Sequence, residues 1–223
     1  MALSEFLFVN RCPVCKRKQV GFDVCAVCRA SLAKAKNPSA ATVRGNMRTY
    51  TSYSLYPYEN PTVKKYFLFA LKKSPTKELV RFAAHDIAEN LIPILPKNAY
   101  TVCFAPRGKK NVRIYGADHM KLVSKQLAKS VAYIDYEKLL SRRGFTKEQK
   151  ELGFDERREN LKGKITASKK DSAKEILILD DIITSASTFI SCADALLCAN
   201  PDAHVTGIFI ATAQRSLKRA ENV

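Results

Sequence analysis

The chain has 223 residues, of which 46% are hydrophobic and 26% are charged, as expected for a folded protein with one main domain and a small appendage. Its 38 Lys+Arg outnumber its 21 Asp+Glu, for a formal net charge of +17. This excess predicts attraction to polyanions such as nucleic acid, anionic lipid or phosphorylated small molecules; a generally lysine-rich composition is the alternative. No run reaches the about 18 apolar residues of a transmembrane segment. The N-terminal stretch contains Glu5 and lacks a basic start, so we expect a cytoplasmic protein.

Four of the seven cysteines form two CxxC pairs near the N-terminus, Cys12/Cys15 and Cys25/Cys28, with nine residues between the pairs. This spacing can bring four thiolates to one tetrahedral centre, which predicts a structural Zn²⁺ site. Disulfides are the competing interpretation, but thiols stay reduced in the cytosol. The other three cysteines lie in apolar surroundings and are expected in the core: Cys103, Cys192 and Cys198.

The apolar pattern divides the chain into a zinc module (1–34), a connector (35–48) and a main domain (49–223). Strands are expected at 50–56, 100–104, 133–140, 176–179 and 205–211, and helices at 62–73, 77–91, 116–131 and from 189 to 197. Strands that alternate with helices indicate an α/β fold, a mostly parallel sheet with helices on both faces.

The expected strand at 100–104 leads into a turn rich in basic residues, which include Arg107, Lys109 and Lys110. Positive charges at the carboxyl end of a strand could stabilise a departing pyrophosphate. A solvated basic loop is the alternative interpretation.

The rest of the chain is organised around residues 176–188. Four apolar residues, Ile176 to Leu179, predict a strand that is buried on both faces. Asp180 and Asp181 follow, then Thr184, Ser185, Ala186, Ser187 and Thr188 lead into a helical pattern. A strand, tight loop and helix in this order place N–H groups at the edge of a sheet, which predicts a phosphate site. Ser187 or Thr188 could also cap the helix.

Asp-Asp-Ile-Ile-Thr-Ser-Ala-Ser-Thr at 180–188 resembles the phosphoribosyl pyrophosphate (PRPP) loop of type I phosphoribosyltransferases. The resemblance implies that Asp180 and Asp181 hold the ribose hydroxyls and that residues 184–188 cradle the 5′-phosphate, with Mg²⁺ bound alongside PRPP. The family has Gly at the position of Ala186. If the loop needs a positive φ there, the Cβ costs roughly 1 kcal/mol.

The order of the parts resembles the ComF (ComFC) competence-protein family, from Phe6 to about Arg215. Arg142, Gln149, Leu152, Arg157, Asn160 and Gly163 match the spacing of a basic segment of that family. The family's Pro-Val-Pro turn is replaced by Phe104-Ala105-Pro106, and its Arg-Gly-Phe-Asn-Gln by Tyr115-Gly116-Ala117-Asp118-His119. With Ala186, these departures bear on turnover more than on PRPP binding.

Three functions follow from this resemblance. The first is phosphoribosyl transfer, either by a ComF protein or by a nucleotide-salvage enzyme. Arg107, Lys109 or Lys110 would bind the pyrophosphate, and His119 is a weak candidate base. The sequence does not identify the acceptor. The second is binding of single-stranded DNA during DNA uptake and natural transformation, which the basic charge favours. The third is a scaffold that recruits competence and DNA-uptake proteins through the zinc module.

Overall fold

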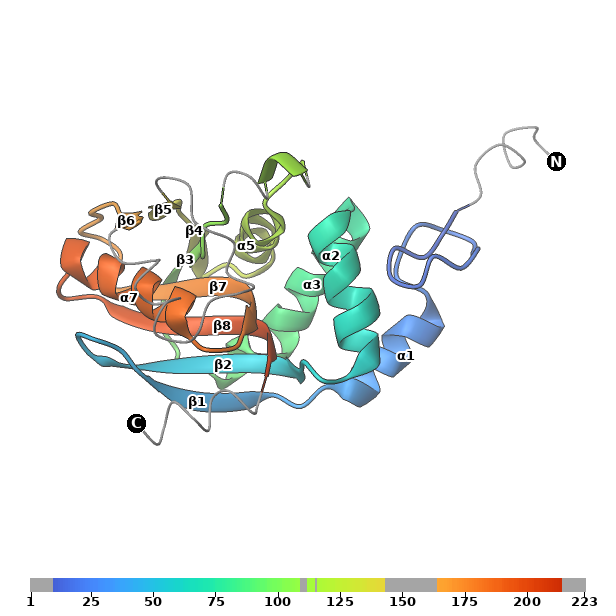
Figure 1. Ribbon diagram of the computed structural model, residues 1–223, viewed down its shortest axis with the longest axis horizontal. Coiled ribbons are helices and arrows are strands. Elements are labelled where there is room, and N and C mark those ends of the chain that lie inside the picture. The colour runs from blue at the N-terminus through green and yellow to red at the C-terminus, as the bar shows by residue number, and fades with distance from the viewer. Residues whose placement is uncertain (1–9, 109–111, 115, 143–163, 214–223) are drawn as a thin grey trace.

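The computed structural model describes residues 10–108, 112–114, 116–142 and 164–213. At its centre is a six-stranded sheet in the order β1-β2-β8-β7-β3-β4 (Figure 1). Its strands are β1 (Ser39–Arg44), β2 (Thr49–Pro57), β3 (Tyr100–Phe104), β4 (Ile134–Tyr136), β7 (Glu175–Ile183) and β8 (His204–Thr212). Neighbours from β2 through β4 are parallel, and β1 pairs with β2 in the antiparallel direction. The predicted mostly parallel sheet is confirmed.

Helices cover both faces of the sheet (Figure 1). Helices α3 (Lys77–Asn90) and α5 (His119–Ser130) pack on one face, and α7 (Ser187–Ala199) packs on the other. The alternation of side chains along β7 explains this arrangement. Leu177 and Leu179 share a buried cluster with α3 and α5, whereas Ile176 and Ile178 share one with α7. The predicted α/β layers are therefore present.

The remaining elements extend or join these layers. They are α1 (Ala26–Ala35), η2 (Thr62–Leu68), α2 (Phe69–Lys73), the 3₁₀ turn η3 (Ile92–Ile94) and a separate antiparallel pair, β5 (Leu140–Arg142) with β6 (Ile165–Ala167). Segment η2 is π-helical, a geometry that is rare in proteins and is often found at functional sites. It begins where Oδ1 of Asn60 accepts hydrogen bonds from the N–H groups of Thr62 and Val63.

The structure differs from the sequence prediction in three places. Residues 39–44, predicted as part of a connector, form β1; an edge strand is stabilised by its ladder with β2, and here only Val43 is fully buried. The strand expected at 133–140 divides into β4 and the first residue of β5. Cys103 and Cys192 are buried as predicted, but Cys198 is exposed, so its assignment to the core is wrong.

The N-terminal segment that carries the two CxxC pairs packs on the side of the sheet that α3 and α5 cover. Cys12, Val24 and Leu32 belong to the same buried cluster as Val63 and Phe67 of η2. Oγ of Ser31 on α1 also lies 3.0 Å from Oγ1 of Thr62. The boundary at residue 34 stays a prediction, because the apolar side chains on its two sides form one continuous cluster.

Strands β3 and β7 are neighbours, but the chain leaves them in opposite directions across the sheet. After β3 it passes through α5 to β4, and after β7 it passes through α7 to β8 on the other side. Such a reversal leaves a crevice beyond the carboxyl ends of the two strands, where ligands of open α/β sheets bind. None of the helices in the described ranges has the length and apolar character of a bilayer-spanning segment.

Candidate functional site

The residues from Asp180 to Thr188 lie at the carboxyl end of β7 and the start of α7. Strand β7 continues through the acidic pair to Ile183, and α7 begins at Ser187. Between them the chain bends at Ala186, whose φ of 56° and ψ of −1° are left-handed. The bend encloses a hollow of about 30 Å³, which is lined by residues 180 and 182–189 and by Phe209 of β8.

The bend presents several main-chain N–H groups at the start of α7. Within the described part of the chain, no hydrogen bond from the N–H groups of residues 184–188 is found. The N-cap of α7 is Ala186, without a side-chain cap, so neither Ser187 nor Thr188 has the capping role considered for it. The first turn of α7 also lacks an acidic residue. Uncapped N–H groups and the positive end of the helix dipole together favour an anion.

Asp180 and Asp181 reach opposite faces of β7, because successive side chains of a strand alternate. Asp180 lines the hollow together with Phe189 and Phe209. Asp181 faces α5, where its Oδ2 lies 3.1 Å from Nε2 of His119. The main-chain N–H of Asp181 donates to Oδ1 of Asp180 at 2.8 Å. The acidic pair therefore contacts both the bend at residues 184–188, on one face of the sheet, and α5, on the other face.

The two carboxyl groups differ in their electrostatic surroundings. Burial raises the pKa of Asp180 well above its usual range, and the neighbouring charge of Asp181 raises it further. Burial alone would also raise the pKa of Asp181. The hydrogen bond and charge of His119, together with the charges of Lys72 and Arg107, instead lower it to about 2. The site thus holds one carboxyl group that resists ionisation and one that stays ionised.

The basic turn after β3 is only partly described. Lys109 and Lys110 lie outside the described residues, as do Gln149, Leu152, Arg157, Asn160 and Gly163 of the basic segment. Arg107 is described, and its N–H donates to Oδ2 of Asp118, the N-cap of α5, at 3.4 Å. This contact joins the turn to the start of α5, next to His119.

Two positive contributors to this site have little or no signal in the sequence. Lys72 comes from α2 and acts on Asp181 through its charge, although it lies more than a hundred residues away along the chain. No motif singles out Lys72 from the other lysines of its helix. His119 is a weak candidate base in the sequence, but its contact with Asp181 requires the sheet.

The four predicted zinc ligands meet at one point. The Sγ atoms of Cys12, Cys15, Cys25 and Cys28 all lie within 4.8 Å of one another. Sγ of Cys12 is 3.9 Å from Sγ of Cys28, and the Sγ atoms of Cys15 and Cys25 are 3.8 Å apart. A tetrahedral Zn²⁺ with bonds of about 2.3 Å requires sulfur–sulfur distances of about 3.8 Å. The cluster therefore fits a tetrahedral metal ion.

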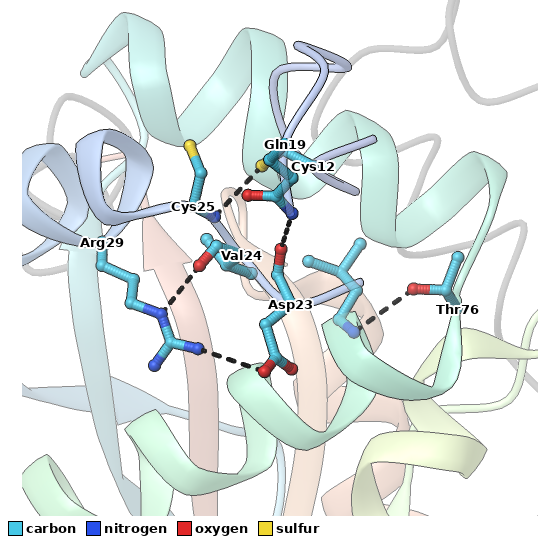
Figure 2. A network of polar contacts seen from close by, with 8 residues as sticks. Cys12, Gln19, Asp23, Val24, Cys25, Arg29 and Thr76 are labelled. Atoms are coloured by element: carbon cyan, nitrogen blue, oxygen red, sulfur yellow. Dashed lines mark hydrogen bonds and ion pairs between the residues drawn. The ribbon is translucent and has the colours of Figure 1, made fainter. Parts of the chain in front are cut away.

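Hydrogen bonds and charge at the cluster also suit a cation. Burial would raise the pKa of Cys12, but N–H groups of Cys25, Cys15 and Val14 lower it to about 7. The N–H of Cys25 donates to Sγ of Cys12 at 3.4 Å, as Figure 2 shows. Burial and the neighbouring thiols raise the pKa of Cys28. A divalent cation would relieve this crowding of negative charge.

Polar contacts brace the second CxxC pair beside α1 (Figure 2). Nε of Arg29 donates to the carbonyl of Val24 at 2.8 Å, and its guanidinium lies 4.0 Å from the carboxylate of Asp23. Nε2 of Gln19 donates to the carbonyl of Asp23. The ion pair is largely exposed and stabilises little, so the hydrogen bonds to carbonyls hold the loop.

Neither the models of known protein families nor the curated proteins include a match to this chain. Two similar solved structures are adenine phosphoribosyltransferases. The one from Leishmania tarentolae has 12% identity and a TM-score of 0.34, and the match covers 79% of this chain and 95% of that one. The one from Leishmania donovani has 12% identity and a TM-score of 0.32, with coverage of 88% and 84%. Similarity at this level does not establish a shared ligand.

Proposed function

We propose that this chain is a phosphoribosyltransferase-like protein of the ComF type, which binds PRPP with Mg²⁺ at the loop between β7 and α7. The observation that carries the proposal is the bend at residues 184–188, whose N–H groups have no partner among the described residues. It directly follows two carboxyl groups at the topological switch point. A sugar phosphate needs this combination, because its phosphate accepts hydrogen bonds and its hydroxyl groups donate them.

In this proposal each part of PRPP has its own binding residues. Residues 184–188 receive the 5′-phosphate, and Asp180 and Asp181 accept hydrogen bonds from the ribose hydroxyls. Arg107, with Lys109 and Lys110, receives the pyrophosphate. Mg²⁺ would neutralise the pyrophosphate, and it keeps most of its waters when bound to substrate phosphates.

Transfer would proceed by attack of a nitrogen nucleophile on C1′ of the ribose. The bond from C1′ to the pyrophosphate oxygen breaks, and pyrophosphate leaves with the electron pair. The contributions of this chain are position and charge: the carboxyl groups hold the ribose, and the basic turn stabilises the leaving anion. The nucleophile would be either the acceptor of a ComF protein or, for a nucleotide-salvage enzyme, a nucleobase.

Calorimetric titration with PRPP and Mg²⁺ tests the pocket. We expect the Asp180→Asn/Asp181→Asn protein to bind PRPP at least about tenfold more weakly, because the hydrogen bond to the charged carboxylate of Asp181 is lost. Asp202→Asn is the matched control, since the Asp202 side chain is 87% exposed in a distant turn. Equal PRPP affinity in the natural protein and the double variant contradicts the proposal.

A second candidate function, binding of single-stranded DNA, has support in one surface. Tyr66 and Phe69, one turn apart on η2 and α2, are 51% and 57% exposed. Nζ of Lys73 lies 5.8 Å from the ring centroid of Phe69. Exposed aromatic rings with neighbouring cations form the stacking platforms that bind single strands. The proposed role in DNA uptake, the competence partners and the cytoplasmic location rest on the ComF resemblance.

Fluorescence anisotropy with a labelled oligothymidine tests this surface. We expect Phe69→Ala to weaken binding by about tenfold, the scale of a lost stacking contact. Tyr133→Ala is the matched control, because Tyr133 is 50% exposed just before β4. Binding that is independent of salt, or equal losses in both variants, contradicts a stacking role for Phe69.

A further inference from the structure

His119 is the buried residue that connects α5 to the acidic pair. It is the first residue of α5, and its side chain is 1% exposed. Met120 and Val123 anchor the helix in the cluster beneath β7, which includes Leu177 and Leu179. On the other side, Asp118 accepts the N–H of Arg107. The imidazole is therefore held from two directions and has little freedom to turn.

The contact with Asp181 sets the roles of the imidazole atoms. An ionised carboxylate only accepts hydrogen bonds, so Nε2 of His119 donates to Oδ2 of Asp181 across 3.1 Å. Nδ1 of His119 is buried and has no partner among the described residues. Because that position is costly for a buried polar atom, packing alone gives no reason for a histidine here. The hydrogen bond to Asp181 supplies one.

A hydrogen bond at Oδ2 restricts the plane of the carboxylate and therefore the direction of Oδ1. Without the imidazole, the side chain of Asp181 could rotate toward the other positive groups whose charges it feels, Lys72 and Arg107. A carboxylate that receives a hydroxyl group must instead point beyond the strand, where the crevice opens. Orientation of an acid by a neighbouring donor is a common way to prepare a binding group.

We propose that His119 is a positioning residue for this site, which holds the Asp181 carboxylate in the orientation that accepts a hydroxyl group of a ribose phosphate. This inference rests on the proposed function, in which Asp181 accepts a hydrogen bond from one of the ribose hydroxyl groups. His119 affects binding of the sugar through Asp181, while the bend at residues 184–188 binds the phosphate. The two halves of the ligand thus have separate determinants.

Three small ligands separate these determinants: inorganic phosphate, ribose 5-phosphate and 2-deoxyribose 5-phosphate. We measure their affinities by NMR titration for the natural protein, His119→Leu and His119→Gln. We expect His119→Leu to weaken ribose 5-phosphate about tenfold, the effect of losing one charged hydrogen bond, and to leave inorganic phosphate unchanged. Gln can still donate to Asp181, so His119→Gln should retain most of the affinity for ribose 5-phosphate. His119→Leu should weaken the binding of 2-deoxyribose 5-phosphate less than it weakens the binding of ribose 5-phosphate.

A double-mutant cycle tests whether His119 acts through Asp181. In an Asp181→Asn background, His119→Leu should change the affinity for ribose 5-phosphate by less than about twofold. A loss as large as in the natural background overturns the proposal, as does a parallel loss of inorganic phosphate. His85→Leu is the control for loss of a histidine, because His85 is exposed on α3 beside Glu89.

Failure of the two proposals looks different. If the natural protein binds phosphate but does not distinguish it from ribose 5-phosphate, the proposed function fails together with this inference. If it prefers ribose 5-phosphate and His119→Leu keeps that preference, only the role of His119 is overturned. Should His119→Leu fail to fold, the comparison of His119→Gln with the natural protein decides, and a lost ribose preference in that variant contradicts positioning through a donor.

Discussion

The main-chain N–H of Asp181 donates a hydrogen bond to Oδ1 of Asp180, the residue just before it. This bond favours the ionised form of Asp180, but burial and the charge of Asp181 outweigh it and raise the pKa of Asp180. A raised pKa in the folded state means that folding takes up a proton as pH rises above the pKa of the unfolded chain. The contribution of Asp180 to stability therefore falls with rising pH until its folded pKa is passed.

Asp180→Asn should remove this dependence, because the amide carries no charge at any pH. We expect the Tm of the variant, relative to the natural protein, to rise as the pH increases above about 4, the ordinary pKa of an Asp side chain. The rise should be about 2–4 °C for each kcal/mol of free energy that ionisation of the buried Asp180 would cost. Thermal unfolding followed by circular dichroism measures it, with Asp202→Asn as the control. A difference in Tm that does not change with pH contradicts this account of Asp180.

Ala186→Gly should stabilise the protein. The left-handed φ of 56° at Ala186 costs about 1–2 kcal/mol for a residue with a Cβ, and Gly adds about 0.5–1 kcal/mol of unfolded-chain entropy. The net gain is between about 0 and 1.5 kcal/mol, or up to about 6 °C in Tm. Ala195→Gly, in the regular part of α7, should instead lose about 1 kcal/mol. A lower Tm for Ala186→Gly would show that the bend is not strained.

Metal removal should weaken the whole protein, because the cysteine cluster belongs to the same buried cluster as η2 and α3. We expect a chelator to lower the Tm of the natural protein while unfolding remains a single transition. Metal analysis should find about one Zn²⁺ per chain, and Cys12→Ser should lower this content. Cys198→Ser should retain the metal, because Cys198 is exposed on α7. Two separate transitions after chelation contradict the shared core.

Gly207→Ala should destabilise the layer beneath α7. A Cβ at Gly207 would lie 2.6 Å from Cε2 of Phe209 and 2.9 Å from Cε2 of Phe189. These two rings already meet edge to face, with centroids 5.5 Å apart, so overpacking should cost about 1–3 kcal/mol in denaturant unfolding. Phe209→Leu in the same protein should recover part of the loss. Full stability of Gly207→Ala would mean that the rings move at no cost.

The strand, bend and helix at 176–199 and the two CxxC pairs could be predicted from the sequence, because their signals are local. A buried strand, a run of small residues and a helical repeat are set by neighbours along the chain. The missing glycine also drew attention to Ala186, whose left-handed φ only the structure established. The spacing of the cysteines likewise indicated one metal centre before the sulfur atoms were placed.

Tertiary structure alone decided what surrounds the acidic pair. His119 lies 62 positions before Asp181, and they meet because β3, which leads toward α5, pairs with β7. The edge strand β1 also escaped prediction, since it buries little and depends on hydrogen bonds to β2. Contacts between distant residues follow from sheet order, and sheet order is set by the packing of both faces at once, which no local stretch of sequence contains.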